Sequence, residues 1–388
     1  MRAYHFTEMP YPFLPEDVEE RYGAMRVTLP NRFYDPQKGH ELYNRYLDDY
    51  EYADELGLDI MLNEHHATAT CLDANASISA AALIRRTKRA MIAIVGYPLP
   101  HRNPVQVAEE AAMLDVISGG RMIVGFVRGV GTEIHPANTN PSGTRERMQE
   151  AHDLILKAWT QGEVFNWEGK HFQFRYVNPW PRPYQQPHPP IWITGSNPEG
   201  AAWVADHHYT FCAFLTSYEQ TDALFSRYRA RCREMGYADP PADRFAYLGL
   251  CYTGETDKEA DETGKKLLWY LNRKRPPGFF APYGFAPLQA LARFYDPQGD
   301  ERYTRSWEQL KAQGVVICGG PKAVLEKVKY LHERCGVGHL LMMNQAGFMA
   351  PRETRRSMEL FAREVYPAIR SLGEDPGNAV PTAPSGTS

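Results

Sequence analysis

Short apolar runs alternate with longer amphipathic segments along most of the chain. Apolar runs of about four to eight residues between turn residues indicate buried strands, and apolar positions repeating at helical spacing indicate amphipathic helices. The predicted strands span residues 3–6, 58–62, 90–95, 122–126, 191–194, 208–211, 245–251 and 338–343. The predicted helices span residues 41–56, 74–87, 104–117, 143–160, 198–205, 218–235, 257–272, 321–334 and 352–372.

The order of these elements predicts a closed (β/α)8 TIM barrel with parallel strands. Each predicted strand is followed by a helix, which is the arrangement of parallel α/β folds. Asn103-Pro104 and Asn197-Pro198 are helix starts, because asparagine caps a helix and proline suits its first turn. An open doubly wound sheet is the alternative, but no G-x-G-x-x-G pattern follows the first strand.

Two stretches, about residues 162–190 and 276–314, interrupt the alternation as insertions. The first is rich in proline and aromatic residues, which excludes a helix and predicts extended segments on the outside of the barrel. The second is expected to act as a lid or substrate wall, or equally as a packing or dimer arm. Residues 1–372 are expected to form one domain, and the polar tail 373–388 is expected to be disordered.

Composition narrows the class of protein. A chain of 388 residues with 43% hydrophobic content has enough apolar residues for a large core. The formal net charge of −4 gives no general attraction for nucleic acid or an anionic membrane surface. No apolar run has the length of a membrane span, and the start lacks the apolar region of a signal peptide. The 6 cysteines form no C-x-x-C pair, so we expect reduced thiols in a cytoplasmic protein.

The most informative motif is Glu64-His65-His66, because it follows the predicted strand 58–62. In barrel enzymes the chemistry gathers at the carboxyl ends of the strands. Histidine is the side chain best suited to proton transfer near neutral pH. A purely structural polar cluster is the alternative.

Two further strand ends carry groups suited to an anion. Val127-Arg128-Gly129 follows strand 122–126, and arginine offers phosphate a planar fork of donors beside a permissive glycine. Gly195-Ser196-Asn197 precedes the helix 198–205, whose free N–H groups and dipole favour an anion. A salt bridge at Arg128 and an ordinary helix cap at Asn197 are the alternatives.

Taken together, four segments in register resemble the bacterial luciferase-like flavin-dependent monooxygenase family. They are residues 62–66, 95–105, 113–129 and 189–196, and the likeness ends near residues 361–367. The resemblance implies a TIM barrel that uses FMNH2 and O2, through a C4a-peroxyflavin, to oxygenate a small organic substrate. It also implies a separate flavin reductase that supplies FMNH2, and a homodimer in which the small residues of helix 74–87 lie at the interface. Close packing of these small residues on the barrel's own sheet is the alternative.

The resemblance also implies roles for particular residues. His65 would be the catalytic histidine, supported by Glu64 and His66, and the phosphate of FMN would bind between Arg128 and Ser196. A cis peptide bond would join Val95 to Gly96 beneath the flavin. Some luciferases have a reactive cysteine where this chain has Val127, so nothing here favours light emission. The residues expected to bind FMN are Val95, Gly96, Val127, Arg128, Gly129, Gly195, Ser196 and Asn197.

Three other functions stay open. An F420-dependent reductase or dehydrogenase of the same superfamily would use the same barrel for hydride transfer. A metal-dependent TIM-barrel hydrolase could use Glu64, His65 and His66, but adjacent histidines in a strand point to opposite faces, and no third ligand has suitable spacing. We therefore predict no metal site. A flavin-binding protein without catalysis is the last alternative.

Overall fold

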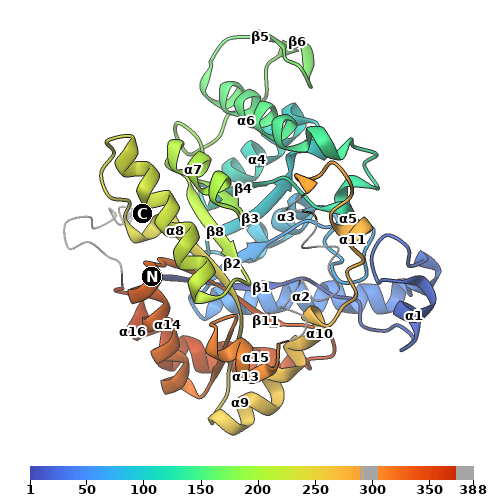
Figure 1. Ribbon diagram of the computed structural model, residues 1–388, viewed down its shortest axis with the longest axis vertical. Helices are drawn as coiled ribbons and strands as arrows, with labels where there is room; N and C mark the ends of the chain where they lie inside the picture. Colours follow the sequence, from blue (N-terminus) through green and yellow to red (C-terminus); the bar gives the residue numbers. More distant parts are fainter. Residues whose placement is uncertain (289–290, 292–304, 373–388) are drawn as a thin grey trace, which may run out of the picture.

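Eight parallel strands close into a barrel in the computed structural model, which describes residues 1–288, 291 and 305–372 (Figure 1). In ring order, the strands are β1 (Arg2–Thr7), β2 (Asp59–Leu62), β3 (Ile92–Pro98), β4 (Met122–Val127), β7 (Ile191–Thr194), β8 (Thr210–Phe214), β9 (Phe245–Thr253) and β11 (His339–Gln345). β11 pairs with β1, and β8 pairs with β9, so the ring has no open edge. The predicted (β/α)8 barrel is confirmed.

The strands are almost completely buried, which explains why continuous apolar runs identified them. All seven residues of β3 and all nine of β9 are buried. β8 begins two residues later than predicted, because His208 adopts a left-handed backbone conformation with φ of 55°. A residue in that conformation belongs to a turn and cannot extend a strand.

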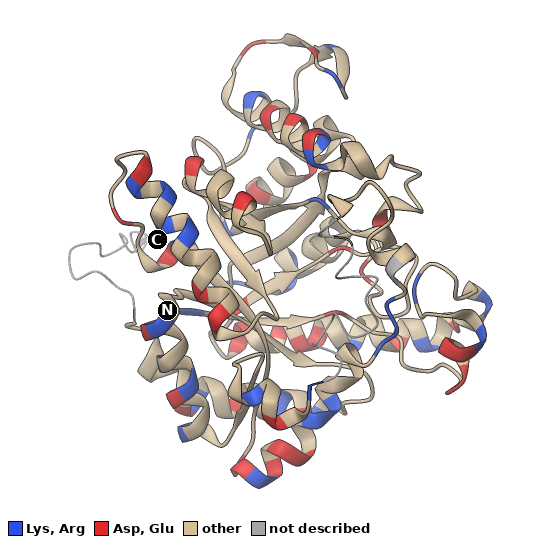
Figure 2. Cartoon of the chain, viewed as in Figure 1, with Lys and Arg blue, Asp and Glu red and all other residues tan. Residues whose placement is uncertain are grey.

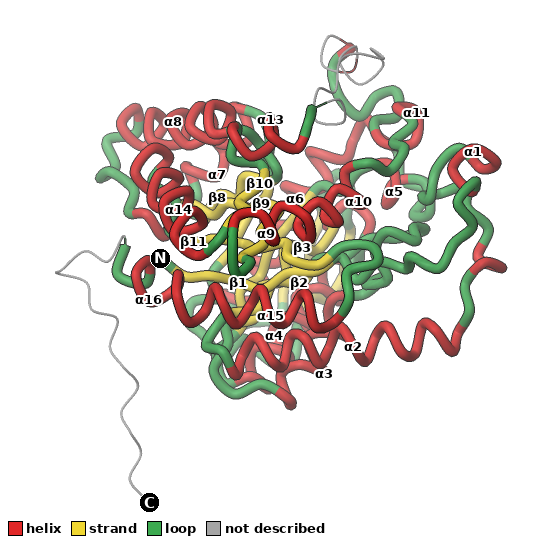
Figure 3. Tube along the Cα trace, turned by 90° about the horizontal axis from the view of Figure 1, so that it is seen from below, coloured by secondary structure: helices red, strands yellow, loops and turns green. Residues whose placement is uncertain are grey.

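Helices surround the barrel, with the longer ones outside the strands (Figure 3). The helices of the barrel layer are α2 (Pro36–Glu55), α3 (Ala76–Arg86), α4 (Pro104–Ser118), α6 (Thr144–Thr160), α7 (Pro198–Asp206), α8 (Tyr218–Glu234), α14 (Pro321–Cys335) and α15 (Pro351–Leu360). α1 (Val18–Tyr22) and α5 (Gly131–Ile134) are short helices in loops. The predicted caps are present: Asn103 accepts from the N–H groups of Val105 and Gln106 at the start of α4.

Two predicted helices are interrupted, each for a local reason. The helix predicted over residues 257–272 divides into α9 (Asp257–Gly264), a 3-10 turn and α10 (Leu268–Leu271). The break falls at Gly264, and glycine weakens a helix interior. The helix predicted over residues 352–372 contains a π-turn, Phe361–Val365, before α16 (Tyr366–Ile369). Pro367 has no N–H to donate, which disturbs the regular ladder there.

The two insertions contain their own elements. The first forms an antiparallel hairpin of β5 (Phe165–Glu168) and β6 (Gln173–Val177), so the predicted extended segments are confirmed; the hairpin projects beyond α6 in Figure 1. The second contains α11 (Pro277–Phe280) and α13 (Trp307–Ala312), followed by β10 (Val316–Gly319), which pairs with β9. Residues 289–290, 292–304 and the predicted disordered tail 373–388 lie outside the described residues. The domain boundary at residue 372 stays a prediction.

The core has two layers, one inside the barrel and one between the barrel and the helices. Along β1, Tyr4 and Phe6 belong to the first cluster and Ala3 to the second, as the alternation of a strand requires. Charged residues lie mainly on the surrounding helices and loops (Figure 2). Within the described ranges, none of the helices combines the length and apolar character needed to cross a lipid bilayer.

Candidate active site

The residues singled out from the sequence lie at the carboxyl ends of neighbouring strands. Their strands, β2, β3, β4 and β7, are consecutive in the barrel. Parallel strands bring these ends to one face of the molecule. In ring order the residues are Glu64, His65 and His66 after β2, Val95 and Gly96 within β3, Val127, Arg128 and Gly129 at the end of β4, and Gly195, Ser196 and Asn197 after β7.

His65 is held by a carboxylate from a different strand-end loop. Its Nδ1 lies 2.8 Å from Oε1 of Glu133, which belongs to α5 after β4. Glu133 is buried and also accepts from the Thr132 hydroxyl at 2.6 Å and the Val130 N–H at 2.7 Å. This bond fixes the ring orientation of His65 and leaves Nε2 as the nitrogen available to a ligand.

The pair is charged at neutral pH. Burial alone would lower the pKa of His65, but the carboxylates of Glu133 and Glu8 beside it raise this pKa to about 8. Burial would raise the pKa of Glu133, but the charge and hydrogen bond of His65, together with its other donors, lower it to about 2. At pH 7 the site therefore holds an imidazolium bonded to a carboxylate, and the side chain of His65 is still 31% exposed.

Glu8, directly after β1, completes the surroundings of His65. Its Oε2 accepts from Nδ2 of Asn63 at 3.0 Å and lies 3.8 Å from Nε2 of His65. Its other oxygen, Oε1, is buried without a hydrogen-bond partner. A buried carboxylate oxygen without a donor is unusual and marks a functional position.

Glu64 and His66 belong to a separate network of hydrogen bonds and ion pairs, which does not include Glu133 or Glu8. His66 Nε2 lies 3.2 Å from Oε1 of Glu64, whose Oε2 receives Nη1 of Arg102 at 2.9 Å. Arg102 also contacts Glu110 at 2.8 Å, and Glu64 accepts the first N–H of α3, from Ala76, at 3.3 Å. Glu64 therefore anchors α3 and the loop after β2, which is a structural role.

The Val95–Gly96 peptide bond is cis, as the resemblance implied. Gly96 is closely packed against β4, because a Cβ there would lie 2.5 Å from the carbonyl oxygen of Gly125. Gly125 is equally confined, with a Cβ position 2.5 Å from the carbonyl oxygen of Ile94. The two strands approach here at a distance that only glycine permits.

Arg128 is a half-buried cation at the end of β4. Its guanidinium lies over the ring of Phe285, 3.5 Å from the centroid. Burial, together with the charge of the nearby Arg145, lowers the pKa of Arg128 to about 10. Among the described residues, no carboxylate forms an ion pair with it. An anion bound at this position would pair with the guanidinium of Arg128 and offset the cost of burying its charge.

The helix after β7 begins at the cap that the sequence predicted. Asn197 is the cap of α7 and accepts from the Gly200 N–H at 2.7 Å, while Ser196 is exposed. Gly195 is required by packing, since a Cβ there would lie 2.7 Å from the ring of Phe211.

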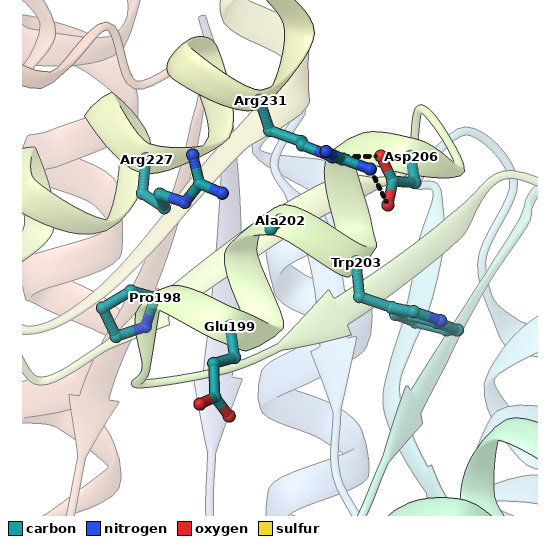
Figure 4. Close-up of a pocket in the computed structure, with 7 residues that line it drawn as sticks. All are labelled: Pro198, Glu199, Ala202, Trp203, Asp206, Arg227 and Arg231. Atoms are coloured by element: carbon teal, nitrogen blue, oxygen red, sulfur yellow. Dashed lines mark hydrogen bonds and ion pairs between the residues drawn. The ribbon is translucent and has the colours of Figure 1, made fainter. Parts of the chain in front are cut away.

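The outer side of α7 forms part of a surface groove with α8 (Figure 4). The groove has a volume of about 420 Å³, and Arg231 and Asp206 form an ion pair across it, with 2.7 Å between Nε and Oδ1. It lies between two helices rather than at the strand ends, so it is not the site described here.

The second insertion covers this end of the barrel. Its helix α11 lies beside α5 in both Figure 1 and Figure 3. The carbonyl oxygen of Phe279 occupies the place of a Cβ on Gly131, 1.3 Å from the ideal position. His135 Nε2 also lies 3.4 Å from the carbonyl oxygen of Gly278. This part of the insertion packs against the loop after β4, and its role as a lid or substrate wall, or as a packing or dimer arm, stays a prediction.

The described residues contain one grouping of possible metal ligands, His152, Asp153 and His207. It lies on α6 and after α7, away from the motif that suggested a hydrolase. His65 and His66 point to different carboxylates, so the histidines and Glu64 do not converge on one position.

Three residues of this site were not predicted from the sequence. Glu8 follows the first strand directly and could have been found by examining every strand end. Glu133 lies in the loop after β4, six residues beyond the strand, and only the fold brings it to His65. Arg102 comes from the loop before α4 and has no sequence signal of its own.

Comparison with known proteins identifies the family. Residues 25–337 match the family model described as luciferase-like monooxygenase. The chain belongs to the luciferase-like monooxygenase family. It is 24% identical over 377 residues to the oxygenase component of a flavin-dependent trigonelline monooxygenase from Acinetobacter baylyi, covering 92% of this chain and 99% of that protein. The resemblance inferred from the motifs is confirmed.

Solved structures of luciferase-like enzymes share the fold. The oxygenating constituent of 3,6-diketocamphane monooxygenase from Pseudomonas putida, in complex with FMN, superposes with a TM-score of 0.70 at 20% identity, covering 94% of this chain and 98% of that one. An F420-dependent secondary alcohol dehydrogenase superposes with a TM-score of 0.66 at 17% identity, covering 84% of this chain and 95% of that one. At these identities the likeness establishes the fold alone.

Proposed function

We propose that this chain is the oxygenase component of a two-component FMN-dependent monooxygenase. In this proposal a separate flavin reductase supplies FMNH2, and the chain uses it with O2 to oxygenate a small organic substrate. The main observation behind this proposal is the His65–Glu133 pair. The charged imidazole of His65 is fixed at the strand ends by Glu133, and its Nε2 makes no hydrogen bond with the described residues. The name of the Acinetobacter relative supports the same reading.

The strand ends fit the phosphate of FMN. Arg128 is a partly buried cation for which no carboxylate ion pair exists among the described residues, and Ser196 directly precedes Asn197, the cap of α7, where free N–H groups favour an anion. Gly129 has a φ of 75°, so its backbone turns back at the end of β4. We assign the phosphate to Arg128, Gly129 and the Gly195-Ser196-Asn197 turn, and the flavin ring to Val95, Gly96 and Val127.

Bound FMNH2 supplies the electrons that activate O2, so that one oxygen atom enters the substrate and the other leaves as water. The contribution of the chain is the control of one proton. His65 holds it on Nε2, with Nδ1 fixed by Glu133, and its pKa of about 8 keeps it protonated at pH 7. The wall formed by α11 limits the access of water, which would otherwise divert the reaction.

Anaerobic binding followed by an oxygen pulse tests the proposal. We expect the chain to bind FMNH2 and to delay the return of oxidised flavin relative to free FMNH2. In His65→Ala, we expect faster release of H2O2 with binding of FMNH2 retained. Hydride transfer with F420 in the absence of oxygen, together with no effect on FMNH2, would instead establish the F420-dependent alternative.

We also propose a homodimer formed through α3 and α4. These helices contact each other and leave apolar side chains exposed on the outside: Ile78 (71%), Met113 (49%), Val116 (43%) and Ile117 (48%). Several apolar side chains exposed together on neighbouring helices mark a surface that is suited to contact with another protein. Light scattering after Ile117→Glu tests this: a monomer is expected for the variant, and a wild-type monomer would contradict the proposal.

We place the protein in the cytoplasm, as predicted from the cysteine pattern. All six cysteines are free and buried, which suits a compartment that keeps thiols reduced. Fractionation of the native host, with the chain recovered among periplasmic proteins, would contradict this assignment.

A further inference from the structure

Arg26 lies beside the strand-end loop that carries the catalytic motif. The backbone around it runs antiparallel to that loop, with the N–H of Val27 2.6 Å from the carbonyl oxygen of Ala67. The N–H of Ala69 also lies 3.0 Å from the carbonyl oxygen of Met25. An arginine distant in sequence is thereby fixed directly beside the loop that begins with His65.

The guanidinium of Arg26 is buried and only partly satisfied. The residue is 6% exposed, and its Nε donates to Oγ1 of Thr70 at 3.0 Å. Its Nη1 is buried with no hydrogen-bond partner, and no carboxylate of the described chain lies within ion-pair distance. Burying an unpaired cation costs several kcal/mol unless a partner is supplied.

The residues around Arg26 show that its unpaired Nη1 lies near the candidate active site. The rings of Tyr270 and Phe280 lie 5.8 and 5.1 Å from its Cζ. Its charge acts on His65, whose pKa it lowers, and on Tyr270. Glu8 acts on the same two residues without pairing with Arg26. Arg26, Glu8 and Tyr270 therefore surround the catalytic imidazole on the side of β1 and β2.

Among the described residues, Arg26 and Arg128 are two arginines near the strand ends that form no ion pair with a carboxylate. The phosphate of FMN belongs to Arg128, which lies next to the N-terminus of α7 in the ring of strands. Arg26 instead lies beside the loop after β2, and its guanidinium lies over the rings of Tyr270 and Phe280, which suit an organic molecule. Guanidinium N–H groups match the geometry of a carboxylate.

We propose that Arg26 binds a carboxylate of the oxygenation substrate, so that the substrate is a small organic acid. That this acid is the substrate rests on the proposed function. The binding of a carboxylate at Arg26 does not depend on it. In the complex, Nη1 donates to a carboxylate oxygen, and the aromatic rings of Tyr270 and Phe280 contact the carbon skeleton. This anchors the acid beside His65, where oxygen transfer takes place.

Calorimetry on the flavin-free protein tests this with matched acids and amides. The probes are benzoate with benzamide and hexanoate with hexanamide, since each pair differs in charge but little in shape. We expect at least one acid to bind at millimolar concentrations or better, and its amide to bind at least tenfold more weakly. Arg26→Met is expected to lose about tenfold or more in affinity for the acid and little for the amide. Arg26→Lys is expected to retain part of the affinity for the acid.

Arg273→Met is the control, since Arg273 lies near the same loop but is paired with Glu19 at 3.2 Å. It is expected to bind the acid like the wild type. Equal binding of acid and amide, no binding of either acid, or equal losses for acid and amide in Arg26→Met would overturn the proposal.

Flavin binding separates this proposal from the proposed function. Arg26→Met is expected to bind FMN and riboflavin as the wild type does. If it instead loses affinity for FMN but not for riboflavin, Arg26 binds the flavin phosphate and the carboxylate assignment is wrong. If the wild type binds the acid but not FMNH2, the proposed function fails while the anion site at Arg26 stands.

Discussion

Nδ1 of His65 lies 2.8 Å from Oε1 of Glu133, a residue 68 positions further along the chain. This contact joins the loop after β2 to the loop after β4, across the end of β3. It gives the half-buried imidazole of His65 one fixed orientation. The catalytic proposal for His65 therefore depends on a carboxylate that the motif itself does not contain.

Replacing Glu133 by glutamine should lower the pKa of His65 from about 8 toward the ordinary value. The amide still accepts a hydrogen bond but no longer stabilises the imidazolium by charge. NMR titration of the histidine signals measures this pKa directly. The pH dependence of oxygenation should move to lower pH in the variant. An unchanged titration of His65 would contradict the assignment, and Glu168→Gln on the exposed hairpin serves as the control.

The same pair makes stability depend on pH. A histidine with a raised folded-state pKa stabilises fully below its unfolded value of about 6.5, and this contribution is lost as the pH rises through about 8. The Glu133 carboxylate contributes above its unfolded value and loses its contribution as the pH falls toward 2. The difference in Tm between wild type and Glu133→Gln should therefore be largest near pH 5 to 6 and smaller at pH 9. A constant difference would contradict this.

Arg128→Met should weaken FMN binding by roughly tenfold to a hundredfold and leave riboflavin binding nearly unchanged. The two ligands differ only in the phosphate, which we assign to Arg128 and the turn before α7. Fluorescence quenching of each ligand measures the effect. Arg175→Met, on the exposed hairpin strand β6, is the matched control. Equal losses for both ligands would mean that Arg128 supports the ring or the fold instead.

The strands and most helices were predictable because the barrel strands are buried on both faces and the helices are amphipathic or capped. Strand-end residues such as His65 and Arg128 followed from the same reasoning, since parallel strands bring their ends together. The partners were not predictable. Glu133 and Arg26 lie in loops whose course depends on tertiary contacts, and neither shows periodicity. The start of β8 was misplaced because nothing in the sequence marks the left-handed backbone of His208.

Gly96→Ala should destabilise the fold by about 1–3 kcal/mol or more. The new Cβ would lie 2.5 Å from the carbonyl oxygen of Gly125, and this backbone lies in a strand that has no room to move. Urea denaturation measures the change. Gly162→Ala is the control, because nothing lies within 4 Å of its Cβ position. Similar stabilities of the two variants would show that β3 and β4 separate easily.

Glu64→Ala should reduce the free energy of unfolding by about 3–5 kcal/mol, because a buried carboxylate paired with Arg102 is removed. His66→Ala should cost less than about 1 kcal/mol, since its imidazole is partly exposed and makes one contact with Glu64. Chemical denaturation of both variants checks the order. If His66→Ala lowers the free energy of unfolding more than Glu64→Ala does, the structural role assigned to Glu64 is wrong.

The contact between Phe279 and Gly131 limits how the second insertion can be exchanged among relatives. A side chain at position 131 would occupy the place of the Phe279 carbonyl oxygen. An insertion grafted from another enzyme therefore has to be accompanied by a compatible residue in the loop after β4, which also carries Glu133. In this barrel, a new insertion at this position and the orientation of His65, the proposed catalytic histidine, have to be engineered as one unit.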